Sequence, residues 1–144
     1  MSMQLIDVDN CKRFNDTYGH LDGDTSLREI AHAARRPGDF AARYGGEEFA
    51  VVLPTISVSG AIQVADTTRR AVVQTAIPHA ATATGVVTVS VGVATLRPNM
   101  MSTIVDLTAA AAALYQAKAA GRSQVAVDHT TTGSWQVQVG QAIC

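Results

Sequence analysis

Residues 42–54 read ARYGGEEFAVVLP, a stretch in which two glycines separate two runs of strand-forming residues. This pattern predicts a β-hairpin with Gly45 and Gly46 in a tight turn. Glu47 and Glu48 follow the glycines directly, although neighbouring carboxylates repel each other and glutamate favours strands poorly. The turn explains the glycines, so the two acids need a separate explanation.

The segments around this hairpin predict one α+β domain, a sheet with helices packed over it. Residues 36–39, RPGD, have proline and glycine at the central positions of a type II turn. Asp24 stands where a helix N-cap is expected. Apolar runs and helical spacing of apolar side chains predict the other elements, which are strands at 3–9, 85–96 and 122–127 and helices at 10–19, 23–36, 59–76 and 102–121.

The composition fits a compact single domain. The chain has 144 residues, 47% hydrophobic and 16% charged, with a formal net charge of −1. This balance argues against a general attraction to nucleic acid or to an anionic membrane. No apolar run approaches the roughly 20 residues of a membrane span, and the first residues lack the basic start of a signal peptide, so we expect a cytoplasmic protein. Cys11 and Cys144 fit no metal spacing and are expected to be free thiols.

Two further acids, Asp7 and Asp9, lie on one face of the first predicted strand. If that strand pairs with the hairpin, three or four carboxylates share a small volume, where two like charges about 4 Å apart repel by ~4 kcal/mol at an effective dielectric near 20. A divalent metal would relieve the repulsion, and oxygen ligands favour Mg²⁺ or Mn²⁺ over zinc. A nucleotide substrate would then follow, because Mg²⁺ completes its coordination with water and phosphate. Spacing alone leaves open a solvated acidic rim.

Four motifs in the chain resemble one known family, the GGDEF-domain diguanylate cyclases in their GGEEF variant. They are DVDNCKRFNDTYGHLDGD at 7–24, RYGGEEF at 43–49, VTVSVGVA at 87–94 and ALYQAKAAGRSQV at 113–125. The resemblance covers residues 4–127. It implies a palm-like, mainly antiparallel sheet flanked by helices over residues 1–128, with residues 129–144 as a tail or an extra edge strand.

The resemblance also implies a reaction. Two GTP molecules, one on each of two facing domains of a homodimer, condense to cyclic di-GMP and two pyrophosphates. The metal ligands would be Asp7, the Val8 carbonyl and Glu47, with Glu47 also the candidate general base. Asp9 and Glu48 would be outer-shell groups or ligands of a second metal, and both possibilities stay open.

The same resemblance assigns substrate contacts. Lys12 would contact phosphate, unless it is simply an exposed lysine. Asn15 shares a helical stripe with apolar residues yet carries an amide, which needs partners when buried. The resemblance supplies guanine as that partner, with Asp24 accepting from the base and His20 nearby. Lys118 and Arg122 would form a second phosphate-binding pair, although Lys118 could instead extend to solvent from the end of an apolar stripe.

A regulatory site is implied at the RPGD turn, where Arg36 and Asp39 match the family's RxxD site for inhibitory product. A local ion pair is the alternative, and Thr67 replaces an arginine that supports this site in the family. The guanine pocket around Asn15 could also accept product.

Some of the family's features are replaced or absent. The helix and DxLTGLxNRR segment that precede the first strand are absent from this sequence, and the resemblance implies an upstream sensory or dimerisation domain in a full-length protein. Ala111 and Ser123 replace a usual aspartate and a usual asparagine. Two alternatives to a cyclase therefore stand: a receptor that binds GTP or cyclic di-GMP without turnover, and a structural domain that binds no nucleotide.

Overall fold

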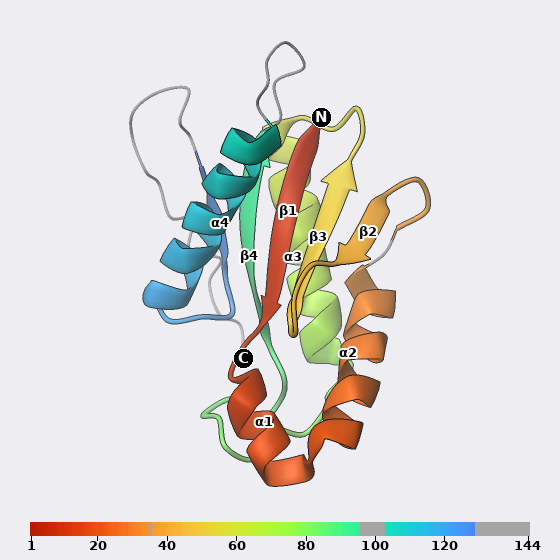
Figure 1. The fold of residues 1–144 in the computed structure, drawn as a ribbon, viewed down its shortest axis with the longest axis vertical. Coiled ribbons are helices and arrows are strands. Elements are labelled where there is room, and N and C mark those ends of the chain that lie inside the picture. The colour runs from red at the N-terminus through yellow and green to blue at the C-terminus, as the bar shows by residue number, and fades with distance from the viewer. Residues whose placement is uncertain (35, 96–102, 129–144) are drawn as a thin grey trace.

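A computed structural model of the chain describes residues 1–34, 36–95 and 103–128. Strands and helices follow one another in the order that the sequence predicts (Figure 1). They are β1 (Ser2–Val8), α1 (Cys11–Tyr18), α2 (His20–Ala34), β2 (Phe40–Arg43), β3 (Glu48–Leu53), α3 (Val58–Gln74), β4 (Val89–Thr95), α4 (Thr103–Ala119) and β5 (Val125–Val127).

The five strands form one sheet in the order β2-β3-β1-β4-β5. All neighbouring strands are antiparallel except β4 and β5, which are parallel, so the predicted mainly antiparallel sheet is confirmed. β1 is the central strand, and its register places Asp7 opposite Glu48 of β3 on one side and Ser90 of β4 on the other. The first strand therefore does lie beside the hairpin.

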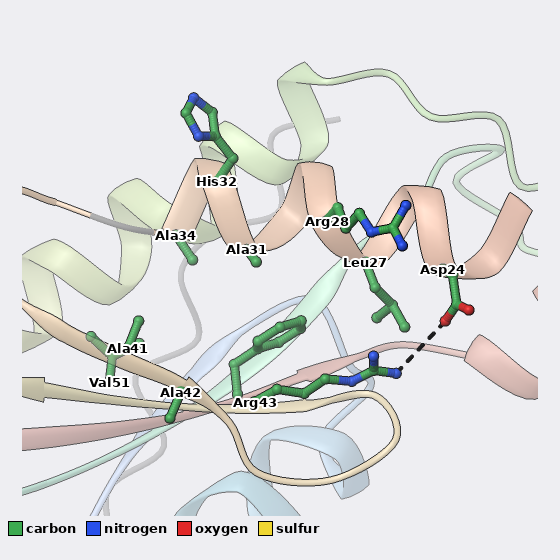
Figure 2. A pocket seen from close by; sticks show the side chains of 11 residues that line it. Asp24, Leu27, Arg28, Ala31, His32, Ala34, Ala41, Ala42, Arg43 and Val51 are labelled. Carbon is green, nitrogen blue, oxygen red and sulfur yellow. Dashed lines mark ion pairs between the residues drawn. The ribbon is translucent and has the colours of Figure 1, made fainter.

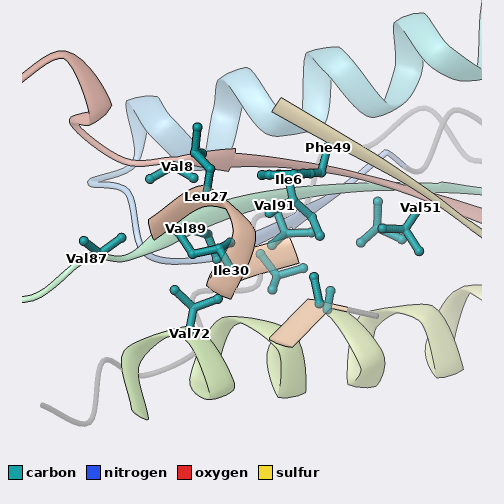
Figure 3. Packing of buried hydrophobic residues seen from close by; sticks show 14 of the residues in the cluster. Ile6, Val8, Leu27, Ile30, Phe49, Val51, Val72, Val87, Val89 and Val91 are labelled. Carbon is teal, nitrogen blue, oxygen red and sulfur yellow. The ribbon is translucent and has the colours of Figure 1, made fainter. Parts of the chain in front are cut away.

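Helices cover both faces of the sheet (Figure 1). Residues of α2 and α3 join the main core, in which Ile6, Phe49 and Val91 come from three different strands (Figure 3). Within this core the buried Gln4 amide donates to the Ala61 carbonyl of α3 at 2.9 Å, and so joins β1 to that helix. Burial of these side chains supplies the main driving force for folding.

On the opposite face α4 packs very closely against the middle of β4. A Cβ added at Gly92 would lie 2.2 Å from the Ala110 carbonyl oxygen and 2.4 Å from the Leu114 nitrogen. Only glycine fits there, because real Cβ atoms do not approach backbone atoms so closely. The glycine thus sets the distance between α4 and the sheet.

Two predicted details are wrong. α2 begins at His20, so Asp24 lies inside the helix and is not its N-cap; Gly19, with φ of 87°, ends α1 and lets the chain enter α2 at once. The hairpin loop is also wider than a two-residue turn, since residues 44–47 separate β2 from β3 and neither Gly45 nor Gly46 has a positive φ. Side-chain hydrogen bonds from Arg43 hold this loop instead.

Other local predictions agree with the structure. Gly38 has φ of 90°, and the Asp39 N–H donates to the Arg36 carbonyl at 3.2 Å, as a type II turn requires. None of the helices in the described part of the chain combines the length and the apolar character needed to cross a bilayer. The predicted tail or strand at 129–144 lies outside the described residues, as does Cys144, whereas Cys11 is a buried free thiol.

Candidate active site

The end of β1 and the tip of the β2–β3 hairpin meet. The Val8 N–H donates to the Glu47 carbonyl at 3.2 Å, and Asp7 is paired in register with Glu48. The three positions expected to bind metal, Asp7, Val8 and Glu47, are therefore neighbours although some forty residues separate them along the chain. The strand pairing of the fold creates this arrangement.

Asp7 is a buried carboxylate that is 3% exposed. Burial raises its pKa from 3.8 to about 6; the nearby Lys118 opposes this change, while Glu47 and Glu48 add to it. The Lys118 Nζ lies 2.8 Å from Asp7 Oδ2 and supplies the positive charge that the buried acid needs. Lys118 thus turns inward to the acid rather than extending into solvent.

The oxygen donors at this point fit a hard divalent cation. No group of three or more His, Cys, Asp or Glu side chains among the described residues is gathered closely enough to hold a metal. The expected set, however, needs only two carboxylates and one backbone carbonyl. Mg²⁺ is commonly bound by one or two carboxylates, with water and substrate phosphate as its other ligands. Asp7 beside Glu47 and Glu48 has the excess of negative charge that such an ion neutralises.

Asp9 has a different environment from Asp7. Its carboxylate accepts hydrogen bonds from the Thr88 hydroxyl at 2.7 Å, the Ser90 hydroxyl at 2.6 Å and the Ser123 N–H at 3.0 Å. It is 2% exposed. These three donors favour a structural role for Asp9, joining the end of β1 to β4 and to the loop before β5.

The α1 helix carries Lys12, which is exposed, and Asn15, which is half-buried. The Asn15 Nδ2 lies 4.0 Å from Cys11 Sγ, and its Oδ1 is buried without a hydrogen-bond partner. A Cβ added at Gly23 would lie 2.0 Å from this Oδ1, so glycine makes room for the amide. Asn15 therefore has unused hydrogen-bonding capacity, whereas His20, the first residue of α2, is exposed.

Between α2 and the β2–β3 hairpin lies a cavity of about 480 Å³, within the size range of small-molecule sites (Figure 2). Apolar side chains such as Leu27 and Phe49 line it, and Asp24 and Arg43 stand together at one end. The Arg43 Nη2 lies 3.8 Å from Asp24 Oδ1. Asn15 does not line this cavity, so the structure does not place the two expected guanine contacts in one pocket.

Arg122, the other expected phosphate contact, is exposed just beyond α4 and has φ of 65°. Its N–H donates to the Ala117 carbonyl at 3.1 Å, which closes the end of the helix. The structure thus places Lys118 on Asp7 and leaves the Arg122 side chain outside that ion pair.

The expected product site shows the local ion pair that was its alternative. The Arg36 Nε lies 3.6 Å from Asp39 Oδ2, and the Asp39 side chain is 4% exposed. On α3, Arg69 and Arg70 both pair with Asp66, at 2.9 Å and 2.8 Å. The arginines in this part of α3 are therefore engaged next to Thr67.

Sequence reasoning missed Arg43 and His79. Arg43 opens the RYGGEEF motif, and that position was the available signal. His79 is fully buried; its Nε2 lies 3.1 Å from the Asn10 carbonyl, and its ring packs edge-on against Phe14 at 5.3 Å. These contacts stabilise the connection between β1 and α1. His79 lies in a loop, and no sequence pattern indicated its role.

Comparison with known proteins identifies the family of this chain. The family model described as "Diguanylate cyclase, GGDEF domain" matches residues 1–124. The chain belongs to the GGDEF family. This GGDEF chain is 40% identical over 128 residues to diguanylate cyclase A of Treponema denticola, covering 87% of this chain and 34% of that protein. It is 39% identical over 129 residues to diguanylate cyclase DgcP of Pseudomonas aeruginosa, covering 87% of this chain and 19% of that protein.

Among solved structures, the GGDEF domain of DgcB from Caulobacter crescentus, in complex with c-di-GMP, is similar with a TM-score of 0.78 and 35% identity. The match covers 88% of this chain and 77% of that one. The α+β GGDEF fold expected from the sequence is thereby confirmed. The chain spans about a third of the Treponema relative and less of the Pseudomonas one.

Proposed function

We propose that this chain is the catalytic domain of a diguanylate cyclase, which condenses two GTP molecules into cyclic di-GMP and two pyrophosphates. The observation that carries this proposal is the meeting of β1 with the hairpin tip, through the Val8–Glu47 hydrogen bond and the pairing of Asp7 with Glu48. The names of the relatives as diguanylate cyclases support it. So does the complex of the DgcB domain with c-di-GMP.

Asp7, the Val8 carbonyl and Glu47 would hold a divalent metal, Mg²⁺ or Mn²⁺, with Glu48 as a further acidic ligand. The bound ion would lower the pKa of a reacting hydroxyl and neutralise charge on the leaving pyrophosphate. Glu47 would accept the proton of the 3′-hydroxyl as general base. The hydroxyl oxygen forms a bond to the α-phosphorus of the other GTP, and the bond from that phosphorus to the pyrophosphate oxygen breaks.

Asp24 and Asn15 would recognise guanine, with His20 beside them. Asp24 would accept hydrogen bonds from the amino and imino groups of the base, and the Asn15 amide, whose Oδ1 is buried without a partner, would have to turn to reach it. A site built from such groups rejects adenine, because the wrong base leaves buried polar atoms without partners. Lys12, Lys118 and Arg122 would offset phosphate charge.

Each domain would bind one GTP, so catalysis would need two chains face to face. An upstream domain in a longer protein would control this pairing. Product would inhibit, either at Arg36 and Asp39 after their ion pair opens or in the guanine pocket around Asn15.

A receptor that binds GTP or cyclic di-GMP without turnover is the second candidate. The ion pair between Lys118 and Asp7 favours it, because Asp7 has a counter-charge without any metal. Such a protein would pass its signal to a partner by binding alone.

One experiment separates these functions. The concentrated chain is incubated with GTP and Mg²⁺, and cyclic di-GMP and pyrophosphate are measured beside Glu47→Gln as control. We expect both products from the wild-type chain and a large loss with Glu47→Gln. Nucleotide binding without products supports the receptor, and neither binding nor products contradicts both proposals.

A further inference from the structure

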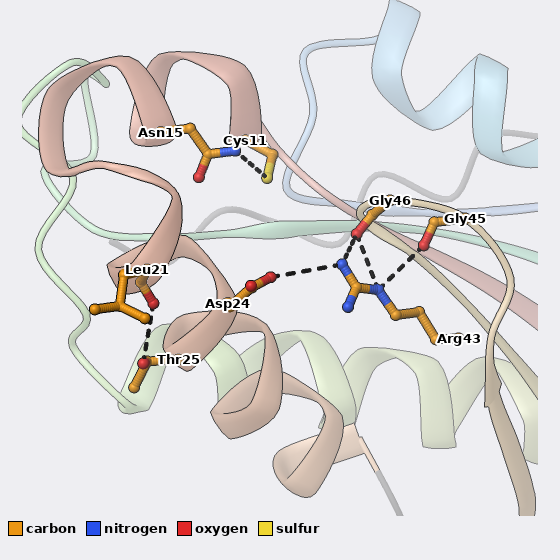
Figure 4. Close-up of polar contacts among 8 residues, drawn as sticks. All are labelled: Cys11, Asn15, Leu21, Asp24, Thr25, Arg43, Gly45 and Gly46. Atoms are coloured by element: carbon orange, nitrogen blue, oxygen red, sulfur yellow. Dashed lines mark hydrogen bonds and ion pairs between the residues drawn. The ribbon is translucent and has the colours of Figure 1, made fainter.

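Arg43 contacts both α2 and the hairpin loop, two parts of the site that are separate in the sequence. Figure 4 shows its guanidinium between them. On one side lies Asp24 of α2, 3.8 Å from Nη2. On the other side lie the carbonyls of the hairpin loop. Nε donates to Gly45 at 3.2 Å and to Gly46 at 3.1 Å, and Nη2 also donates to Gly46.

These hydrogen bonds fix the orientation of two peptide groups. In a trans peptide the N–H points opposite to the carbonyl of the preceding residue. Because the carbonyls of Gly45 and Gly46 face Arg43, the N–H groups of Gly46 and Glu47 point away from it. Neither N–H has a hydrogen-bond partner within the described residues. Two free, adjacent N–H groups can both donate hydrogen bonds to an anionic oxygen.

The loop is open at Gly46, although not at Gly45, where an added Cβ would lie 3.0 Å from Glu48 Oε2. A Cβ added at Gly46 would meet nothing within 4 Å. Any side chain there would stand in open space near the free N–H groups. A bulky anion such as phosphate can therefore approach the backbone directly.

We infer that Arg43 is a positioning residue that couples base recognition to phosphate binding. Its fork holds the two loop carbonyls, so the N–H groups of Gly46 and Glu47 face a triphosphate. The same guanidinium holds Asp24 Oδ1 and keeps that carboxylate turned toward the guanine edge, with Oδ2 left to accept a second hydrogen bond. Arg43 itself contacts neither base nor phosphate. This inference rests on the proposed function.

Replacing Arg43 by lysine or by alanine separates its two proposed effects, which are on the loop carbonyls and on Asp24. Arg43→Lys keeps a charge near Asp24 but cannot bond two carbonyls with a rigid planar fork. Arg43→Ala removes both contacts. Arg70→Ala is the matched control, since Arg70 is also an exposed arginine paired with an aspartate, its side chain 63% exposed against 51% for Arg43.

Affinity is measured by calorimetry with Mg²⁺ and two unreactive probes, 3′-deoxy-GTP and 3′-deoxy-ITP, the second of which lacks the 2-amino group of guanine. With Arg43→Ala we expect affinity for both probes to fall about tenfold, the effect of losing one charge-assisted hydrogen bond. We also expect the preference for the GTP probe to shrink at least about threefold by the same reasoning. With Arg43→Lys affinity falls while the preference is kept, and Arg70→Ala changes neither.

A second readout needs no ligand. NMR relaxation of the N–H groups of residues 45–47 is compared in the nucleotide-free proteins, and we expect lower order in Arg43→Ala and Arg43→Lys than in Arg70→Ala. Wild-type order and wild-type preference in a folded Arg43→Ala protein would overturn the inference. A wild-type chain that binds neither probe would overturn the proposed function instead, while the relaxation data would still decide whether Arg43 orders the loop.

Discussion

Lys118 Nζ lies 2.8 Å from Oδ2 of Asp7, so the last turn of α4 supplies the counter-charge of the acid at the end of β1. The Lys118 side chain is 32% exposed and that of Asp7 only 4%. A mostly buried acid with one cation beside it is sensitive both to pH and to any change in that cation.

Metal-free protein should lose stability as the pH rises from about 4 to about 6. The folded protein holds the Asp7 proton more tightly than the unfolded chain, because burial raises the folded pKa to about 6 from 3.8. The free energy of unfolding therefore falls across this window, by about 3 kcal/mol at most. Thermal unfolding of the wild type and Asp7→Asn, measured at several pH values, checks this. Equal slopes for the two proteins would contradict it.

Lys118→Met should destabilise the metal-free domain at pH 7 by about 2 kcal/mol, because a buried carboxylate loses its only close cation among the described residues. Methionine keeps the length and the apolar packing of the stem. Chemical unfolding measures the loss. The double variant Asp7→Asn/Lys118→Met is the control, since it removes the unpaired charge and should recover most of the stability. An additive loss in the double variant would show that packing, not charge, was affected.

Asp9→Ala should lower stability by about 2–3 kcal/mol and leave the loop before β5 less ordered, because three donors, two of them buried, lose their acceptor. Asp9→Asn should lose less, since its carbonyl still accepts from two of them. If Asp9 is structural, the folded Asp9→Asn protein should keep most of its Mg²⁺ affinity in calorimetry. A loss of metal binding as large as that of Asp7→Asn would instead make Asp9 a ligand.

Gly92→Ala should destabilise the domain by at least about 2 kcal/mol, because the new methyl group meets the backbone of α4 at Ala110 and Leu114. Displacement of the helix should also separate Lys118 from Asp7. Gly46→Ala is the control for stability, since its Cβ meets nothing within 4 Å. Similar melting temperatures for the two variants would show that α4 adapts without strain.

Binding of cyclic di-GMP to two variants distinguishes the two proposed product sites. Cyclic di-GMP is titrated by calorimetry into the wild type, Arg36→Ala and Asn15→Ala. If product binds at the RPGD turn, Arg36→Ala should weaken binding about tenfold, the loss expected for one charged hydrogen bond, and Asn15→Ala should not. A loss confined to Asn15→Ala would reject the turn site in favour of the guanine pocket.

The sequence predicted the fold well where periodicity and glycine signals agree. The order of strands and helices and the type II turn at Gly38 match the structure, and the pairing of β1 with the hairpin, which the sequence left as a condition, is present. The start of α2 was wrong because Asp24 is a good capping residue, yet the chain enters the helix directly after Gly19. The capping preference of aspartate was overridden there, because the connection through Gly19 lets α2 begin four residues earlier.

Side-chain partners were harder to predict than positions. The sequence placed Asp7 and Asp9 together as acids, but only the fold reveals that Asp9 is surrounded by hydroxyl and N–H donors whereas Asp7 faces Lys118. Arg43 was missed because its ion-pair partner, Asp24, becomes a neighbour only when α2 packs beside the hairpin. Such contacts depend on tertiary geometry, which spacing along one chain does not encode.

The hydrogen bond between Gln4 and Ala61 helps to fix the register of β1 in the sheet. Side chains alternate along a strand, so a slip of one residue would turn Asp7 into the apolar layer and put Ile6 at the proposed metal site. The same slip would move the Gln4 amide to the other face of the sheet, away from its acceptor on α3. One buried amide on the central strand thereby disfavours the misaligned chain.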